Sequence, residues 1–308
     1  MKTNFRNSAI LFLILSFSLL LFLFKSNATA LDQFPFVVIG DMGCDCDGQQ
    51  EVALKMLEWY KDHPYQTVLT VGDNIYGTTF GFLKGSMGGN QNLFALRFDK
   101  HYKVLLDQGI KFYATLGNHD VITNKGRDEI DDKVRFNILS DEGYYSFSPL
   151  GLESLVTFFA LDSNTLTPKN PELKQIDWLK KSLAASKSIW KIAYFHHPLY
   201  TPDSLHAADR SFRNLLEPIF VQGGIQIGFS GHNHFYARMK LQKGVTYFIT
   251  GGGGNKLNSP IINSQTEVAV RSFQFMYLEL HSDRAEFWSI PPTGKFLDHG
   301  TILPQRVK

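Results

Sequence analysis

Short apolar runs alternate with longer amphipathic segments along most of the chain. Residues 36–39 are apolar without interruption and predict a strand buried on both faces. In residues 50–60, Val52, Met56 and Trp59 recur at helical spacing and predict a helix. By the same criteria we expect strands at 67–71, 111–116, 155–161, 190–195, 225–229 and 245–250, and helices at 93–106, 171–185 and 208–221.

The order of these segments predicts the fold class. Strands and helices alternate until about residue 250, after which 273–281 and 284–289 alternate as antiparallel strands do. No repeat or linker divides residues 31–308. We therefore expect one α/β domain over 31–308, a layered sandwich of mixed β-sheets flanked by helices.

The first 30 residues have the layout of a secretory signal peptide. Lys2 and Arg6 precede an apolar and serine-rich run over 9–24, and the small residues around Ala28 and Ala30 offer a cleavage site. An uncleaved anchor is the alternative, although the run is short for a membrane span. We expect residues 1–30 to be removed and the protein to be exported, to an extracellular, periplasmic or lysosome-like compartment, with no membrane attachment afterwards.

Composition and charge exclude several classes of protein. The 308 residues are 44% hydrophobic, with 31 Lys and Arg against 29 Asp and Glu, as in an ordinary globular chain. Lys2, Arg6 and Lys25 supply three positive charges of the leader, so the remainder is nearly neutral. Such a chain has no strong attraction for nucleic acid, and we expect none as a partner.

Polar residues that can bind metal ions follow the ends of five predicted buried strands. In open α/β sheets, ligands bind outside the carboxyl ends of the strands. Asp, Asn and His delivered from five strands to one edge predict a metal centre. The segments are Asp41-Met42-Gly43, Gly72-Asp73-Asn74-Ile75-Tyr76, Gly117-Asn118-His119-Asp120, Phe195-His196-His197-Pro198 and Gly231-His232-Asn233-His234.

This ordered set resembles the motifs of the calcineurin-like metallophosphoesterases. The tyrosine at position 76 makes the chain most similar to the purple acid phosphatases, and its size to their small, tartrate-resistant type. The resemblance implies a metallophosphoesterase-type sandwich and a binuclear centre. It places Fe(III) on Asp41, Tyr76 and His234, a divalent ion (Fe(II), Zn or Mn) on Asn118, His196 and His232, and Asp73 between the two ions.

The resemblance also implies roles for further residues. His119 and, by approximate spacing alone, His206 would be cationic in acid, bind phosphate oxygens and protonate the leaving alkoxide. Asp120 could orient the His119 imidazole. His197 is interpreted as a neighbour of His196 without a role of its own. Cys44 and Cys46 are expected to be two reduced or incidental thiols, because a bridge between them would close a strained ring.

The activity that the resemblance implies is acid phosphatase activity. The enzyme would hydrolyse phosphate monoesters, small or protein-borne, through a metal-bound hydroxide. Two alternatives stay open: a phosphodiesterase or nucleotide pyrophosphatase of the same superfamily, and an exported module that binds metal without turnover. A purely structural reading is also possible for single residues, with Asp41 and Asp73 as helix or turn caps and Tyr76 as a packed aromatic. To replace the metal site, such a reading would have to hold at all five segments at once.

Overall fold

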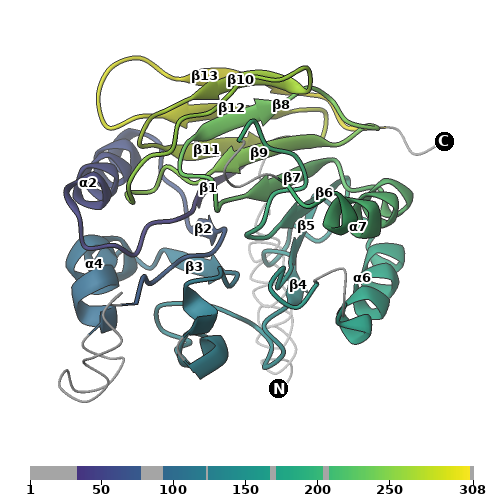
Figure 1. Cartoon of the computed structure of the whole chain (residues 1–308), viewed down its shortest axis with the longest axis horizontal. Helices are drawn as coiled ribbons and strands as arrows, with labels where there is room; N and C mark the ends of the chain where they lie inside the picture. The colour runs from purple at the N-terminus through teal and green to yellow at the C-terminus, as the bar shows by residue number, and fades with distance from the viewer. Residues whose placement is uncertain (1–32, 78–92, 123, 167–170, 204–207, 306–308) are drawn as a thin grey trace, which may run out of the picture. The chain divides into compact units, whose positions relative to one another are not determined.

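The first predicted strand forms β1 (Phe34–Ile39) inside a six-stranded mixed sheet. In the computed structural model, residues 33–77, 93–122, 124–166, 171–203 and 208–305 are described. β1 pairs in parallel with β2 and antiparallel with β11. The strand order is β13 (Asp298–Ile302), β12 (Ala285–Ile290), β11 (Phe275–Leu280), β1, β2 (Thr67–Thr70) and β3 (Lys111–Ala114) (Figure 1).

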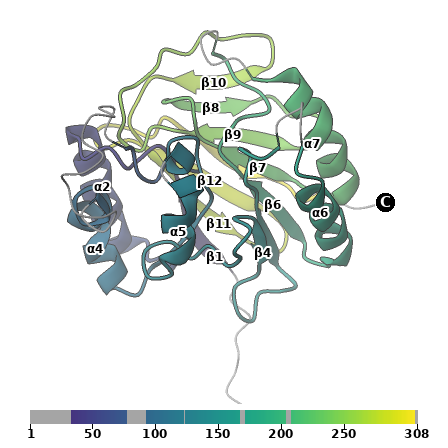
Figure 2. The same cartoon turned by 60° about the horizontal axis from the view of Figure 1, so that its bottom comes forward.

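A second sheet of seven strands faces the first. Its central strands β5, β6, β7 and β9 run parallel, whereas β4, β8 and β10 add antiparallel pairs at the margins. Figure 2 shows the succession of these strands from β10 towards β4. In order they are β10 (Thr266–Val270), β8 (Tyr236–Met239), β9 (Thr246–Thr250), β7 (Ile227–Ser230), β6 (Trp190–Tyr194), β5 (Val156–Ala160) and β4 (Tyr145–Phe147).

Aromatic side chains join the two sheets. The ring of Phe36 on β1 lies 5.2 Å from that of Phe158 on β5 and 6.3 Å from that of Phe229 on β7, between ring centroids. All three side chains are buried in one large apolar cluster to which both sheets contribute. Burial of this shared face is the main driving force for the sandwich.

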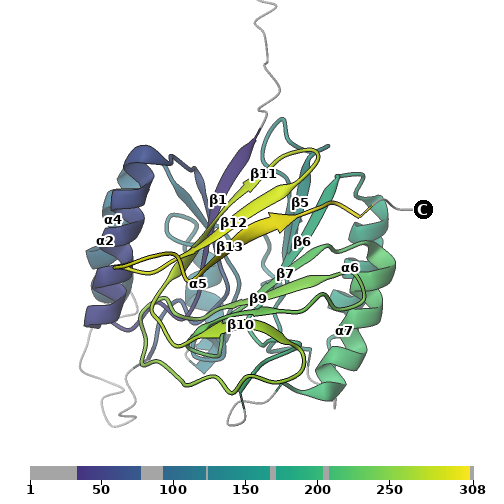
Figure 3. The same cartoon turned by 90° about the horizontal axis from the view of Figure 1, so that it is seen from above.

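Helices cover the outer faces of both sheets. On one side lie α2 (Asp47–Asp62) and α4 (Lys100–Asp107), the latter preceded by a π-helical segment, Ala95–Asp99. On the other side lie α6 (Leu173–Ala185) and α7 (Arg210–Gly223) (Figure 3). Side chains of these two helices belong to a second apolar cluster. Short helical segments, Asp120–Ile122, Asn124–Gly126 and α5 (Arg127–Asp131), follow β3.

The predicted fold class is confirmed: two mixed sheets flanked by helices. Four strands were not predicted, namely β4, β8, β10 and β13. β13 contains Asp298, His299 and Thr301 and lies at a sheet edge, where an apolar pattern is not required. The predicted start of α6 at Pro171 was wrong by two residues, since the helix begins at Leu173. Among the described residues, no helix has both the length and the apolar character needed to cross a membrane.

Candidate metal centre

Loops that follow parallel strands bring the predicted ligands together. Asp41 follows β1, Asp73 and Tyr76 follow β2, and Asn118 follows β3. From the second sheet, His196 follows β6, and His232 and His234 follow β7. The carboxyl ends of both sets of parallel strands therefore meet, as the sequence pattern predicts for a ligand site.

The first group of donor side chains consists of Asp41, Tyr76 and His234, which come from three different loops. The Tyr76 hydroxyl lies 3.2 Å from Asp41 Oδ1 and 3.1 Å from His234 Nε2. His234 Nε2 lies 3.3 Å from Asp41 Oδ1. Two oxygen donors and one nitrogen donor thus converge on one point, a combination suited to a hard, highly charged cation.

The second group consists of neutral donors. Asn118 Oδ1 lies 2.9 Å from His196 Nε2 and 2.9 Å from His232 Nδ1, and the two imidazole nitrogens are 3.2 Å apart. His196 Nδ1 is 2.9 Å from the carbonyl oxygen of Val71, which can only accept. That contact assigns the proton to Nδ1 and leaves the Nε2 lone pair directed at the group.

Asp73 lies between the two groups. Its Oδ1 is 3.5 Å from His196 Nε2 in the second group. Its carboxylate also lies close to the Asp41 carboxylate and the His234 imidazole of the first group, and the ligand atoms of these three residues all lie within 4.8 Å of one another. The same Oδ1 accepts a hydrogen bond from the backbone N–H of His119 at 2.9 Å. A single carboxylate is therefore within reach of both groups.

The backbone of the ligand loops is held in an uncommon conformation. Asp41, Asp73 and His232 have φ values of 58°, 52° and 69°, in the left-handed region that non-glycine residues rarely adopt. The loops also approach closely: a Cβ on Gly117 would lie 2.1 Å from the backbone nitrogen of Asp73. Strain of this kind persists where the surrounding structure enforces it, as at functional sites.

Burial and charge at the site match the needs of bound cations. Asp41, Asp73 and His196 are almost inaccessible to solvent. Burial lowers the pKa of His196 to about 4, which keeps it a neutral donor. Burial, with the charges of Asp41 and Asp73, raises the pKa of Tyr76 well above its usual range. A phenol in these surroundings keeps its proton unless a cation lies beside it, so the donor set fits a pair of metal ions.

The histidines predicted to act on substrate have different outcomes. The His119 ring lies against that of Tyr76, with centroids 4.5 Å apart, beside the first group. His206 lies outside the described residues.

The prediction that Asp120 orients His119 was wrong. Its buried carboxylate accepts hydrogen bonds from the backbone N–H groups of Gly117, Asn74 and Ile75, at 2.7, 3.2 and 2.9 Å, and from Asn74 Nδ2 at 3.0 Å. All four donors belong to the two ligand loops. Asp120 therefore ties the loop after β2 to the loop after β3, because the buried N–H groups of these loops need an acceptor.

His197 takes a larger part in the site than the sequence indicated. Its ring lies 4.8 Å from that of His232, and its Nδ1 is 2.8 Å from the hydroxyl of Ser163, which follows β5. Burial lowers the pKa of His197 to about 3, so the imidazole is neutral. The strand-end rule that found the other residues also applies to Ser163.

The cysteine prediction was wrong as well. Cys44 and Cys46 form a disulfide in the loop between β1 and α2. Asp45 between them adopts a left-handed conformation, with φ of 53°, which turns the chain back and brings the two side chains together. Cys46 also contacts the carbonyl oxygen of Gly254, so the bridge connects this loop to the one after β9.

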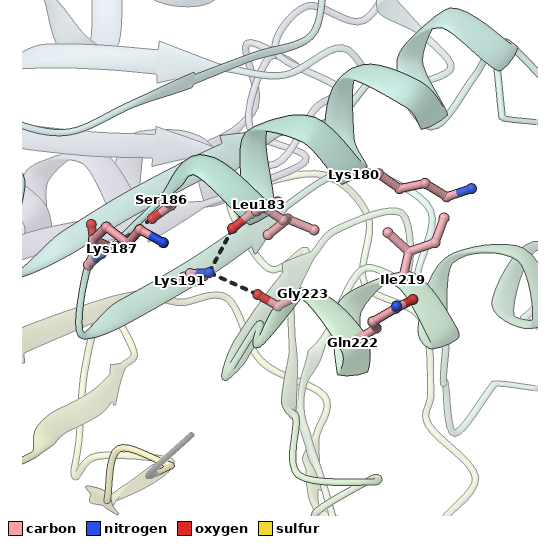
Figure 4. A pocket seen from close by; sticks show the side chains of 10 residues that line it. Lys180, Leu183, Ser186, Lys187, Lys191, Ile219, Gln222 and Gly223 are labelled. Carbon is pink, nitrogen blue, oxygen red and sulfur yellow. Dashed lines mark hydrogen bonds between the residues drawn. The ribbon is translucent and has the colours of Figure 1, made fainter. Parts of the chain in front are cut away.

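A cavity of about 550 Å³ lies elsewhere, at the ends of α6 and α7. Its lining includes Lys180, Lys187 and Lys191, and no carboxylate or imidazole (Figure 4). Lys191 Nζ donates to the carbonyl oxygens of Leu183 at 2.7 Å and Gly223 at 3.0 Å. Its charge is thus engaged with the C-terminal ends of two helices.

Comparison with known proteins agrees with this geometry. The family model of the calcineurin-like phosphoesterases matches residues 34–236, which contain all five ligand segments. The chain belongs to this family. Tartrate-resistant acid phosphatase type 5 of Rattus norvegicus is 25% identical over 267 residues, which cover 78% of this chain and 79% of the relative.

Solved structures of low identity share the fold. GAP50, described as the anchor in the inner membrane complex of Plasmodium, superposes with a TM-score of 0.74 at 18% identity, covering 90% of each chain. A purple acid phosphatase from yellow lupin (Lupinus luteus) seeds superposes with a TM-score of 0.66 at 16% identity, covering 88% of this chain and 54% of its own. The calcineurin-like phosphoesterases and the acid phosphatase relatives together support a hydrolase of phosphate esters.

Proposed function

We propose that this chain is an exported acid phosphatase of the purple acid phosphatase type, acting on phosphate monoesters. The observation that supports the proposal is the pair of donor groups joined at Asp73. One group is rich in oxygen donors and includes Tyr76, whereas the other has only neutral donors. Such asymmetry suits two ions of different charge.

The residues divide between the ions as the donor chemistry suggests. Asp41, Tyr76 and His234 would hold Fe(III), and Asn118, His196 and His232 would hold Fe(II), Zn or Mn, with Asp73 shared. When bound, the ions supply Lewis acidity towards a phosphate ester and towards water. The protein's own contribution is to hold seven side chains in place before substrate arrives.

His119 is the candidate acid. It lies beside Tyr76, and its backbone N–H is bonded to the shared Asp73, so its position is linked to that of the centre. In acid its imidazolium would bind a phosphate oxygen and donate a proton to the leaving alkoxide. His206 remains a second candidate for the same task by its spacing from His196.

The proposed setting of the activity rests on the proposed role of residues 1–30 as a leader. Residues 1–30 would direct export and be removed, leaving the catalytic domain free of the membrane. Its substrates would be small-molecule or protein phosphate esters available in an exported compartment, with no role for nucleic acid.

The test combines the visible spectrum with a comparison of two substrates. We expect the purified protein to absorb in the visible range through an Fe(III)–tyrosinate pair and to hydrolyse p-nitrophenyl phosphate faster than bis-p-nitrophenyl phosphate at pH 5. Tyr76→Phe should abolish the band. Tyr113→Phe is the matched control, because Tyr113 stacks on Phe147 and is not one of the proposed metal ligands, so the band should remain.

The possible failures of this test lead to different conclusions. A full band in Tyr76→Phe would exclude Tyr76 as the ferric ligand. Faster hydrolysis of the diester would indicate a phosphodiesterase. Two bound metals without hydrolysis of either ester would indicate a binding module.

A further inference from the structure

A second cluster of metal-binding side chains lies on the hairpin formed by β11 and β12. Glu279 on β11, His281 just after it and Glu286 on β12 offer ligand atoms that all lie within 4.8 Å of one another. Leu280 pairs with Phe34 at the start of β1, whereas the candidate metal centre follows the end of β1. Six residues of strand, or about 20 Å, separate the two positions.

The hairpin holds these three side chains on a rigid frame. Glu279 and Glu286 are directly opposed in the antiparallel register, so their side chains project from the same face. His281 is two residues after Glu279 and shares that face. Its backbone N–H donates to the carbonyl of Arg284 at 2.8 Å, and its carbonyl accepts from Trp190 Nε1 at 2.7 Å.

Side-chain contacts direct the ligand atoms towards one another. His281 Nε2 is 3.5 Å from Glu286 Oε2, and these side chains are 12% and 31% exposed. The hydroxyl of Tyr277 donates to Glu279 Oε1 at 2.8 Å. A hydrogen bond of this kind orients a carboxylate, as outer partners do around metal sites.

The charge balance of the cluster favours a cation. Two carboxylates directly opposite each other on neighbouring strands destabilise a sheet. The nearby Arg284 compensates in part, since it lies 3.5 Å from Glu286 Oε1, but it also pairs with Asp283 at 3.1 Å. Glu279 has the hydroxyl of Tyr277 as its neighbour and gains no positive charge from that contact.

We propose that Glu279, His281 and Glu286 form a binding site for a divalent transition metal, separate from the phosphatase centre. One imidazole and two carboxylates are a donor set that Zn²⁺ accepts, and the imidazole disfavours Ca²⁺ and Mg²⁺. Bound Zn²⁺ would neutralise the opposed glutamates and join the two strands near their turn.

The experiment is equilibrium dialysis of the purified full chain against Zn²⁺, followed by elemental analysis. The wild-type protein should retain one zinc more per chain than His281→Ala or Glu286→Gln. His299→Ala, an exposed histidine on the adjacent β13, is the matched control and should retain the wild-type amount. Tyr277→Phe keeps the ring but removes the hydroxyl, and should weaken zinc binding about tenfold.

The same measurement in an Asp73→Ala background separates this site from the proposed function. The extra zinc should persist there, and its loss on adding His281→Ala should be unchanged. Equal zinc content in wild-type and His281→Ala proteins would overturn the proposal, as would an equal loss in His299→Ala. Failure of the phosphatase assay would leave this result unaffected.

Discussion

Replacing Asp120 by alanine tests whether this residue joins the ligand loops. The substitution removes the acceptor of three backbone N–H groups and one amide, all buried with it. An unsatisfied buried donor costs about 1–3 kcal/mol. Because water can enter the space left by the carboxylate, we expect a total loss of about 3–5 kcal/mol. For a chain of this size, that lowers Tm by roughly 6–20 °C.

The assay is thermal unfolding of the metal-loaded protein together with the pH profile of kcat. We expect kcat to fall about 100-fold at every pH, since Asp73 and Asn118 lose their relative positions. Asp141→Ala, which removes an 80% exposed side chain, is the control and should leave Tm nearly unchanged. An unchanged Tm in Asp120→Ala, with a shift confined to the acidic limb of the profile, would refute this reasoning and restore Asp120 as a partner of His119.

Two further predictions concern groups outside the ligand set. Burial raises the pKa of Glu129 from 4.5 to about 8, so the folded chain keeps a proton that the unfolded chain releases, and stability falls as pH rises through this window. At pH 8, Glu129→Gln should therefore unfold at a higher urea concentration than the wild type, whereas at pH 4 the two should unfold at the same concentration. An equal difference between their unfolding midpoints at both pH values would contradict this. Lys191→Met should lower Tm by about 2–6 °C, because two helix C-terminal carbonyls lose their donor. Lys187 lines the same cavity, and Lys187→Met should not change Tm (Figure 4). An equal fall in Tm in the two variants would exclude a role of Lys191 in capping the two helices.

Much of the candidate site was predictable because its residues directly follow the carboxyl ends of buried strands. Asp41, Asp73, Asn118, His196 and His232 each follow a short apolar run, and parallel strands direct their carboxyl ends to one edge. The roles of Asp120 and His197 were not predictable in this way. Whether Asp120 accepts from backbone N–H groups or from an imidazole depends on which loops lie beside it.

The sequence by itself determined the alternation of strands and helices, the family and the chemical kinds of the ligands, since all three are written in local pattern and residue type. Only the tertiary structure decided which atoms meet. It placed Asp73 between two donor groups, directed Nε2 of His196 and Nδ1 of His232 at the same oxygen, and closed the bridge between Cys44 and Cys46. It also brought Glu279 opposite Glu286 through strand register. The contacts of Asp73, His196 and His232 join residues from different strands, and their meeting depends on chain direction and sheet order, which no local pattern encodes. The Cys44–Cys46 bridge depends instead on the backbone conformation of Asp45.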